Sequence, residues 1–149
     1  MPRRNFRPAP APVPVVTHVP APPKTARPAG WTARTIELAT RPGDSLTADA
    51  YVSPDGLTAL HRGPETDLNT KADVPRYVVA AIVGGRAWAV IDVRNRRAAT
   101  AAPVAQKAAA ANAESADQLA RMDSAKPGSR TWLDASARIR ALYSAAGLI

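Results

Sequence analysis

The side chains best suited to chemistry are scarce in this chain, which has two histidines and no cysteine among its 149 residues. The absence of cysteine excludes disulfides, thiolate zinc sites and cysteine nucleophiles. Neither His18 nor His61 has a second histidine or a carboxylate at the spacing of a metal site, so we expect no metal and no cofactor. His18 lies in a proline-rich stretch, and we expect His61 to lie at the surface or edge of a strand.

One enzyme pattern is partly present. Pro54-Asp55, together with Asp92-Val93-Arg94, loosely resembles the PD-(D/E)xK nucleases, in which two acidic residues and a basic residue surround a metal ion. The chain departs from that pattern because Arg94 stands where the family has lysine, and because Pro54-Asp55 falls in a predicted tight turn. The flanking helices of the family are also missing. We therefore expect a protein without enzymatic activity.

Arginine is the residue type that gathers in clusters. The cluster at 3–7 places an aromatic side chain between arginines, and the cluster at 94–97 lies between a predicted strand and a predicted helix. Guanidinium groups pair with phosphates, and an aromatic ring can stack on an exposed base. A basic loop before a helix is also suited to phosphate binding. The candidate nucleic-acid-binding residues are Arg3, Arg4, Phe6, Arg7, Arg94, Arg96 and Arg97.

The first thirty residues differ in composition from the rest of the chain. They hold nine of the fifteen prolines, and five basic residues against no acidic one, in a chain of net charge +8. Proline fixes φ and lacks an N–H donor, which favours extended polyproline II geometry over a helix or a central strand. We therefore predict a disordered Pro/Arg-rich arm at residues 1–30 and one domain at residues 31–149.

The domain begins with β-structure. Residues 32–41 form a plausible strand, and residues 46–53 alternate apolar and polar side chains, as a half-buried strand does. Ser53-Pro54-Asp55-Gly56 fits a type I turn, because proline stands at its second position and glycine at its fourth. The returning strand is expected at 57–62.

A second hairpin gives the strongest pattern. Two runs rich in β-forming residues flank Gly84-Gly85, a pair that suits a two-residue hairpin turn. This turn would place Ala81 opposite Trp88 and Val79 opposite Val90. One face of the hairpin is wholly apolar, so we expect the C-terminal helices to cover it.

Two helices are expected within residues 101–147. Pro103 suits the first turn of one helix, which ends at Lys126-Pro127-Gly128. Thr131 to Asp134 is similar to a capping box at the start of the second helix, and Gly147 suits its C-terminal cap. The apolar stripe of this second helix consists of Trp132, Ile139, Leu142, Tyr143 and Ala146.

These elements predict an α+β fold. It has a small antiparallel sheet of about four to five strands, in two hairpins at residues 31–93, which two C-terminal helices cover and which the disordered arm precedes. The favoured function is a non-enzymatic accessory protein that contacts DNA or RNA phosphates non-specifically through the arm and the 94–97 cluster. The alternative is a structural or assembly protein, of a virion or scaffold type, whose residues 1–30 bind a neighbouring subunit.

The longest strongly apolar run, at 78–83, is far shorter than the ~20 residues that a membrane span needs. The first residues also lack the continuous apolar stretch of a signal peptide, because proline recurs there. We therefore expect a cytoplasmic protein without membrane contact.

Overall fold

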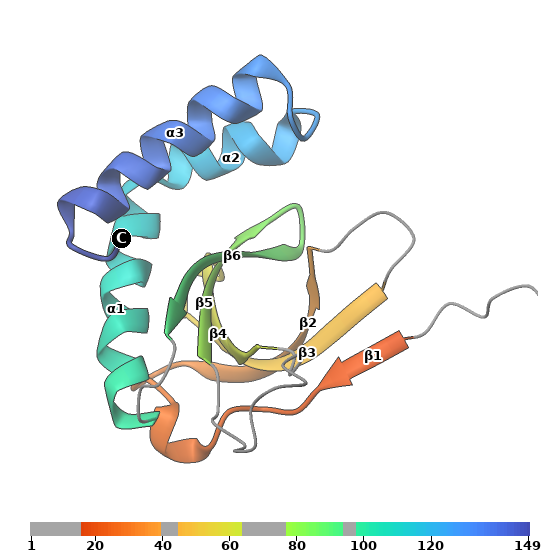
Figure 1. Ribbon diagram of the computed structural model, residues 1–149, viewed down its shortest axis with the longest axis vertical. Helices are drawn as coiled ribbons and strands as arrows, with labels where there is room; N and C mark the ends of the chain where they lie inside the picture. Colours follow the sequence, from red (N-terminus) through yellow and green to blue (C-terminus); the bar gives the residue numbers. More distant parts are fainter. Residues whose placement is uncertain (1–15, 40–44, 64–76, 94–97) are drawn as a thin grey trace, which may run out of the picture.

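The computed structural model describes residues 16–39, 45–63, 77–93 and 98–149. Within these ranges, six strands, one short 3-10 helix and three α-helices follow one another along the chain (Figure 1). Their bounds are β1 Val16–Val19, η1 Lys24–Ala26, β2 Thr32–Leu38, β3 Ser45–Val52, β4 Thr58–Arg62, β5 Tyr77–Val83, β6 Arg86–Val93, α1 Ala98–Glu114, α2 Ala116–Ser124 and α3 Arg130–Ala145.

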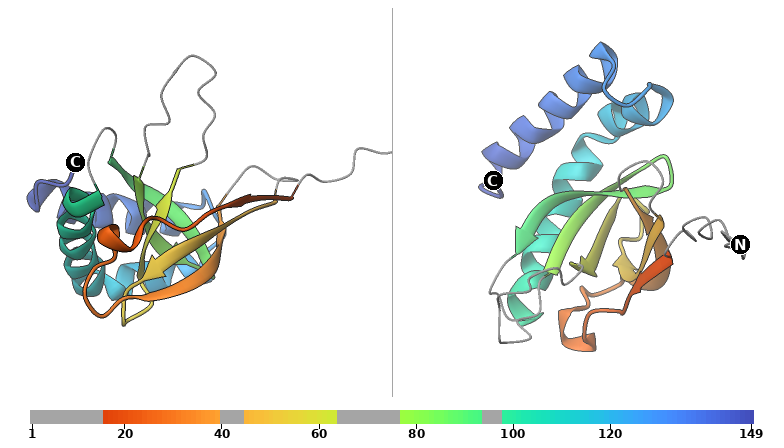
Figure 2. Two further views of the ribbon diagram at one scale, coloured as in Figure 1. Left: turned by 90° about the horizontal axis from the view of Figure 1, so that it is seen from below. Right: turned by 45° about the vertical axis from the view of Figure 1, so that its right-hand side comes forward.

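Strands β2 to β6 close into a five-stranded barrel, which Figure 2 shows from two further sides. Consecutive strands pair antiparallel, and β2 closes the ring by pairing in parallel with β6 through Glu37 opposite Arg86 and Leu38 opposite Ala87. The prediction of an open antiparallel sheet of two hairpins covered by two helices is therefore wrong. It failed because the β2–β6 contact joins residues far apart in the sequence, which no local periodicity records.

Alternate side chains along each strand point into the barrel or outwards, as the β-pleat requires. The narrow interior of five strands is filled largely by alanine, valine and other aliphatic side chains. The described interior residues are Ile36, Leu38, Ala48, Ala50, Val52, Ala59, Ala80, Ile82 and Ala87. They include part of the apolar hairpin face that we expected helices to cover. This described part of the face is buried against the other strands of the barrel instead.

The two predicted tight turns are confirmed. In the first, the Gly56 N–H donates to the Ser53 carbonyl at 2.9 Å. In the second, both residues of Gly84-Gly85 have positive φ, as a type I′ hairpin turn requires.

The hairpin register matches the prediction only near the second turn. Ala81 lies opposite Trp88, as expected. A β-bulge at Val79/Ala80 then shifts the pairing by one residue, so that Val79 lies opposite Ile91 and not opposite Val90.

Three helices follow the barrel, not two. The predicted first helix is divided at Ser115, whose hydroxyl donates to the Ala111 carbonyl at 2.8 Å. Such a bond from serine to the preceding turn often bends a helix. Because α1 begins at Ala98, Pro103 lies inside it and not in its first turn.

The ends of α3 are set by side-chain and backbone caps. Its N-cap is Ser129, whose hydroxyl accepts a hydrogen bond from the Trp132 N–H at 3.3 Å, so the predicted capping role of Thr131 is wrong. The predicted C-terminal cap is confirmed, since Gly147 has a φ of 73° and its N–H donates to the Ser144 carbonyl.

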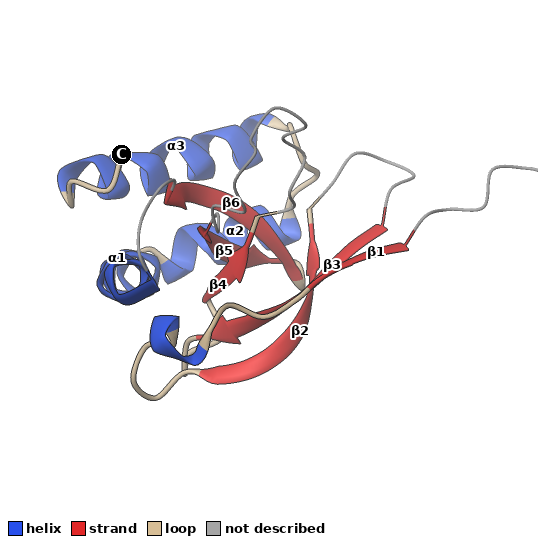
Figure 3. Ribbon diagram, turned by 60° about the horizontal axis from the view of Figure 1, so that its bottom comes forward, coloured by secondary structure: helices blue, strands red, loops and turns tan. Residues whose placement is uncertain are grey.

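The helices cover one part of the outer barrel surface, and Figure 3 shows all three beside β4, β5 and β6. One face of α1 carries small side chains and packs on outward side chains of β3, β4 and β5. Its buried residues are Ala101, Ala105 and Ala108. Helices α2 and α3 pack on Ala81 and Val83 of β5. By contrast, most residues of β2 are exposed.

Strand β1 fills a part of the β3 edge that β4 leaves open. β4 pairs with β3 only at Tyr51 and Val52, whereas β1 pairs in parallel with residues 45–48 on that edge. Val19 packs there against barrel residues that include Ala48 and Ala80. β1 therefore completes the wall of the barrel on this side.

The segment after β1 is also fixed to the barrel. The Tyr51 hydroxyl donates to the Pro22 carbonyl at 2.9 Å, and Ala26 and Pro28 are fully buried. Arg27 donates to the Trp31 carbonyl at 2.7 Å. The prediction of a disordered arm is therefore wrong for residues 16–30, and residues 1–15 lie outside the described residues.

Candidate binding site

The seven predicted nucleic-acid-binding residues lie outside the described residues: Arg3, Arg4, Phe6 and Arg7 precede β1, and Arg94, Arg96 and Arg97 fall between β6 and α1. The structure does place the elements next to them. β1 enters on one side of the barrel, whereas β6 ends on the opposite side, near the start of α1 (Figures 1 and 2). The two points at which the clusters join the described domain are therefore not brought together.

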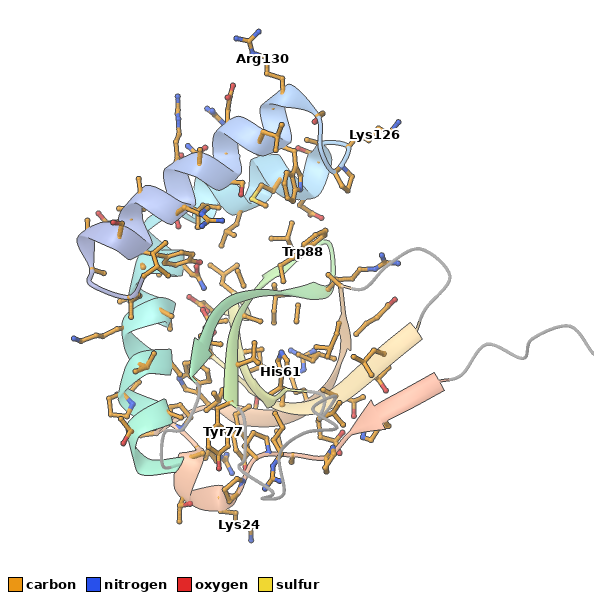
Figure 4. The ribbon with its side chains drawn as sticks, viewed as in Figure 1. Lys24, His61, Tyr77, Trp88, Lys126 and Arg130 are labelled. Atoms are coloured by element: carbon orange, nitrogen blue, oxygen red, sulfur yellow. The ribbon has the colours of Figure 1, made fainter. Side chains whose placement is uncertain are left out.

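His61 is buried, so the prediction of a surface or edge position is wrong. It is 3% exposed, and alternation along β4 places it on the interior side together with Ala59, where Figure 4 labels it. Its Nδ1 lies 2.7 Å from the Arg62 carbonyl oxygen, which identifies Nδ1 as the protonated nitrogen. Burial lowers the pKa of His61, and the hydrogen bond to Arg62 opposes this effect. His61 is therefore a neutral core residue at pH 7.

His18 belongs to an exposed polar network that ties β1 to β3. Its Nε2 lies 3.1 Å from an Asp49 carboxylate oxygen, and its Nδ1 lies 2.8 Å from the Thr47 hydroxyl. Hydrogen bonds from Thr35 and then from His18 lower the pKa of Asp49. Across the described ranges, no group of three or more histidine, aspartate or glutamate side chains is placed to hold a metal ion.

A pocket of about 250 Å³ lies between the β5–β6 hairpin and the helices α2 and α3. We call it the hairpin–helix pocket. Its lining is mainly aliphatic and aromatic, and its polar groups include the Ser136 and Tyr143 hydroxyls and the Arg140 guanidinium. The lining residues are Ala81, Val83, Trp88, Leu119, Met122, Trp132, Ser136, Ile139, Arg140, Tyr143 and Ile149.

Two tryptophans form one part of this lining. The rings of Trp88 on β6 and Trp132 on α3 have centroids 5.6 Å apart and are tilted by 59°. The Trp88 indole N–H donates to the Val83 carbonyl at 3.3 Å, which fixes its orientation on the hairpin. Figure 4 shows Trp88 on the hairpin, facing the helical pair. Since both rings are only partly buried, they can contact a ligand.

The wall formed by α3 follows from helical spacing. Trp132, Ser136, Ile139 and Tyr143 recur three or four residues apart, which brings their side chains to one face of the helix. Ile139 and Tyr143 are buried at the base of this face, whereas Arg140 is exposed beside it. The guanidinium therefore borders an otherwise apolar pocket.

Tyr143 is held from behind by buried polar groups. Its hydroxyl donates to the Asn112 side-chain oxygen, and the Asn112 amide donates to the Thr58 hydroxyl at 2.7 Å. Burial raises the pKa of Tyr143 to about 12, although the hydrogen bond to Asn112 acts in the opposite direction. The phenol is therefore protonated at neutral pH and fixed in place.

The segment that carries α2 and α3 has an excess of basic side chains. Residues 116–149 contain five basic and three acidic side chains. The described residues form ion pairs at His18–Asp49 and at Arg86–Glu37, and none of their carboxylates pairs with Arg140. Arg140 is thus placed to attract an anion at the edge of the pocket.

Sequence reasoning missed this pocket. It recognised the apolar stripe of α3 but interpreted it only as core. Two features could have indicated more: Trp88 directly follows the inward-facing Ala87 on its strand, and Arg140 directly follows Ile139 of the stripe. What the sequence lacks is the contact that places the hairpin opposite α3.

Comparison with protein-family models, curated proteins and solved structures finds no match for this chain. Among the helices described, none is long and apolar enough to cross a membrane. A functional proposal therefore has to start from the pocket and the charges of the chain itself.

Proposed function

We propose that the protein is a non-enzymatic binding protein whose hairpin–helix pocket holds an apolar or aromatic group of an anionic ligand. The observation that carries this proposal is the lining of the pocket, with two tryptophans, a methionine and aliphatic side chains around a volume of about 250 Å³. Concave, mainly apolar sites with few polar groups are typical of ligand-binding sites.

The charge of the ligand is inferred from Arg140. Its side chain borders the pocket, and no carboxylate of the described residues neutralises it. The net charge of +8 adds a long-range attraction for anions. A carboxylate or sulfonate attached to an apolar body would therefore satisfy both parts of the site.

The absence of catalysis is inferred from the titratable groups of the pocket. Tyr143 has a pKa of about 12 and its hydroxyl donates a hydrogen bond to Asn112, so it does not serve as a base near neutral pH. The side chain of arginine has only hydrogen-bond donors and no acceptor. These two side chains favour binding and orientation over proton transfer.

The test is a titration with decanoate, decanol and decyltrimethylammonium, followed by calorimetry or tryptophan fluorescence. Decanoate should bind more tightly than decanol, and decyltrimethylammonium should bind most weakly. Arg140→Gln should weaken decanoate binding several-fold and leave decanol unchanged. Arg138→Gln, which removes the same charge from a different face of α3, is the matched control. Equal binding of all three compounds, or no binding, would refute the proposal.

Contact with nucleic acid is a second candidate, favoured by the five basic and zero acidic side chains of residues 1–30. Binding of a dT oligonucleotide should then weaken steeply with salt, because phosphate contacts release counterions. Replacing Arg94, Arg96 and Arg97 by Gln should flatten that dependence. Absence of binding at low salt would leave the assembly alternative, in which residues 1–30 bind a neighbouring subunit.

A further inference from the structure

We infer that the anionic ligand of the hairpin–helix pocket is an acidic segment of a partner protein, which inserts one apolar side chain into the pocket and lays a second over Leu133. This inference rests on the proposed binding function and identifies its ligand. It follows from an apolar surface that extends beyond the pocket.

Leu133 is 53% exposed and, with Ile149, is one of the two large apolar side chains that are exposed among the described residues. It precedes Ser136 by three residues and Arg140 by seven, so helical periodicity places it on the side of α3 that borders the pocket. It is not itself part of the pocket lining. The apolar surface therefore extends sideways from the pocket, next to Trp132 and Ser136.

The width of this surface favours a peptide over a small molecule. The pocket lining on α3 already runs from Trp132 to Tyr143, about 16 Å at 1.5 Å per residue, and Leu133 lies beside that lining. Ile149, also 53% exposed, extends the apolar lining at the other end. A molecule that only fills about 250 Å³ would leave Leu133 in water. A peptide with apolar side chains one or two helical turns apart could cover both.

The positive charge of Arg140 and of the residues around it favours a negatively charged peptide partner. The first fifteen residues of this chain contain three arginines and no acidic residue, so they carry the same charge as Arg140. A second copy, with a net charge of +8, would be repelled in the same way. An acidic segment of another protein is complementary to Arg140 and to the basic excess of residues 116–149.

The experiment is selection from a phage-displayed library of random peptides about twelve residues long, against the intact chain. The selected peptides should carry acidic residues and at least two apolar side chains, and decanoate should displace them. Their synthetic forms should bind at least about fivefold more weakly to Leu133→Gln and to Arg140→Gln. Arg138→Gln should leave their affinity unchanged. Because all three residues are exposed, the variants should keep the melting temperature of the parent chain.

Leu133→Gln separates this inference from the proposed function. It should weaken the peptides but not decanoate, because Leu133 lies outside the pocket lining. The inference is wrong, and the proposed function stands, if decanoate binds but no acidic peptide is selected. The same holds if the peptides bind the Leu133→Gln variant as tightly as the parent chain. If neither binds, both are wrong. Displacement of decanoate by a dT oligonucleotide would assign the pocket to nucleic acid and also overturn the inference.

Discussion

The Tyr143 hydroxyl on α3 donates a hydrogen bond to the Asn112 side-chain oxygen on α1, and Asn112 in turn donates to Thr58 on β4. Tyr143 and Asn112 are almost completely buried, and Thr58 is fully so. This chain of hydrogen bonds joins both helices to the barrel. It also fixes one wall of the hairpin–helix pocket, since Tyr143 lines it.

Tyr143→Phe should lower the free energy of unfolding by about 1–3 kcal/mol, because it leaves the buried Asn112 oxygen without its donor. Urea unfolding of the variant and the parent measures this difference. Ser124→Ala, which removes an exposed hydroxyl from α2, should change stability by less than about 0.5 kcal/mol. A Phe variant as stable as the parent would show that the bond contributes nothing.

Deletion of residues 1–30 should lower the melting temperature by more than about 5 °C. It removes Val19 from the barrel wall and the Pro22 carbonyl from the buried Tyr51 hydroxyl. Deletion of residues 1–15 removes none of these contacts and is the matched control. Equal melting temperatures of the parent and the 1–30 deletion would contradict the packing of β1 and η1 on the barrel.

Ala80→Leu should destabilise the protein by about 1–3 kcal/mol or more, because the narrow barrel has no room for added methylene groups. Ala80 is fully buried among Leu38, Ala48 and Ala87. Ala120→Leu on the exposed side of α2 adds the same atoms and should be nearly neutral. Chemical denaturation compares the two, and equal stabilities would argue against a closed barrel.

The features of the fold that depend on residues close together in the chain were predicted correctly. The Ser53–Gly56 turn, the Gly84-Gly85 hairpin turn and the Gly147 cap depend on residues close together in sequence, and all three are confirmed. Barrel closure depends on the β2–β6 pairing, in which Glu37 lies opposite Arg86, and no periodicity records it or the placement of β1 beside β3. The proline content of residues 16–30 also misled, because buried prolines can pack without donating hydrogen bonds.

The candidate site was less predictable for the same reason. Trp88 and Trp132 come from elements that are distant in sequence, and only the tertiary structure brings their rings to 5.6 Å. His61 was assigned to the surface or edge because it lies at the end of a predicted strand. The alternation of β4 inside a closed barrel buries it.

His61 should make stability depend on pH. Its pKa lies below 6.5 in the folded protein, mainly because of burial, whereas in the unfolded chain it is ordinary. The unfolded state therefore binds more protons as the pH falls through about 6.5, so stability is complete above that pH and decreases below it. The slope from this residue should reach up to about 1.4 kcal/mol per pH unit.

His61→Gln should remove this component. Urea unfolding between about pH 8 and pH 5 should give a flatter pH dependence for the variant than for the parent. The remaining dependence reports on other groups of the chain. If the free energy of unfolding depends on pH in the same way for the variant and the parent, His61 has the same pKa in the folded and the unfolded state.

The central claim is that the hairpin–helix pocket binds the apolar part of an anionic ligand, and the indole N–H signals of the three tryptophans test it most directly. Trp88 and Trp132 line the pocket, whereas Trp31 is 3% exposed and packs in a different cluster, beside η1 and α1. In ¹H–¹⁵N spectra, addition of decanoate should shift the Trp88 and Trp132 signals in a saturable manner and leave the Trp31 signal in place. Unchanged Trp88 and Trp132 signals at saturating decanoate, or equal shifts of all three, would contradict the claim.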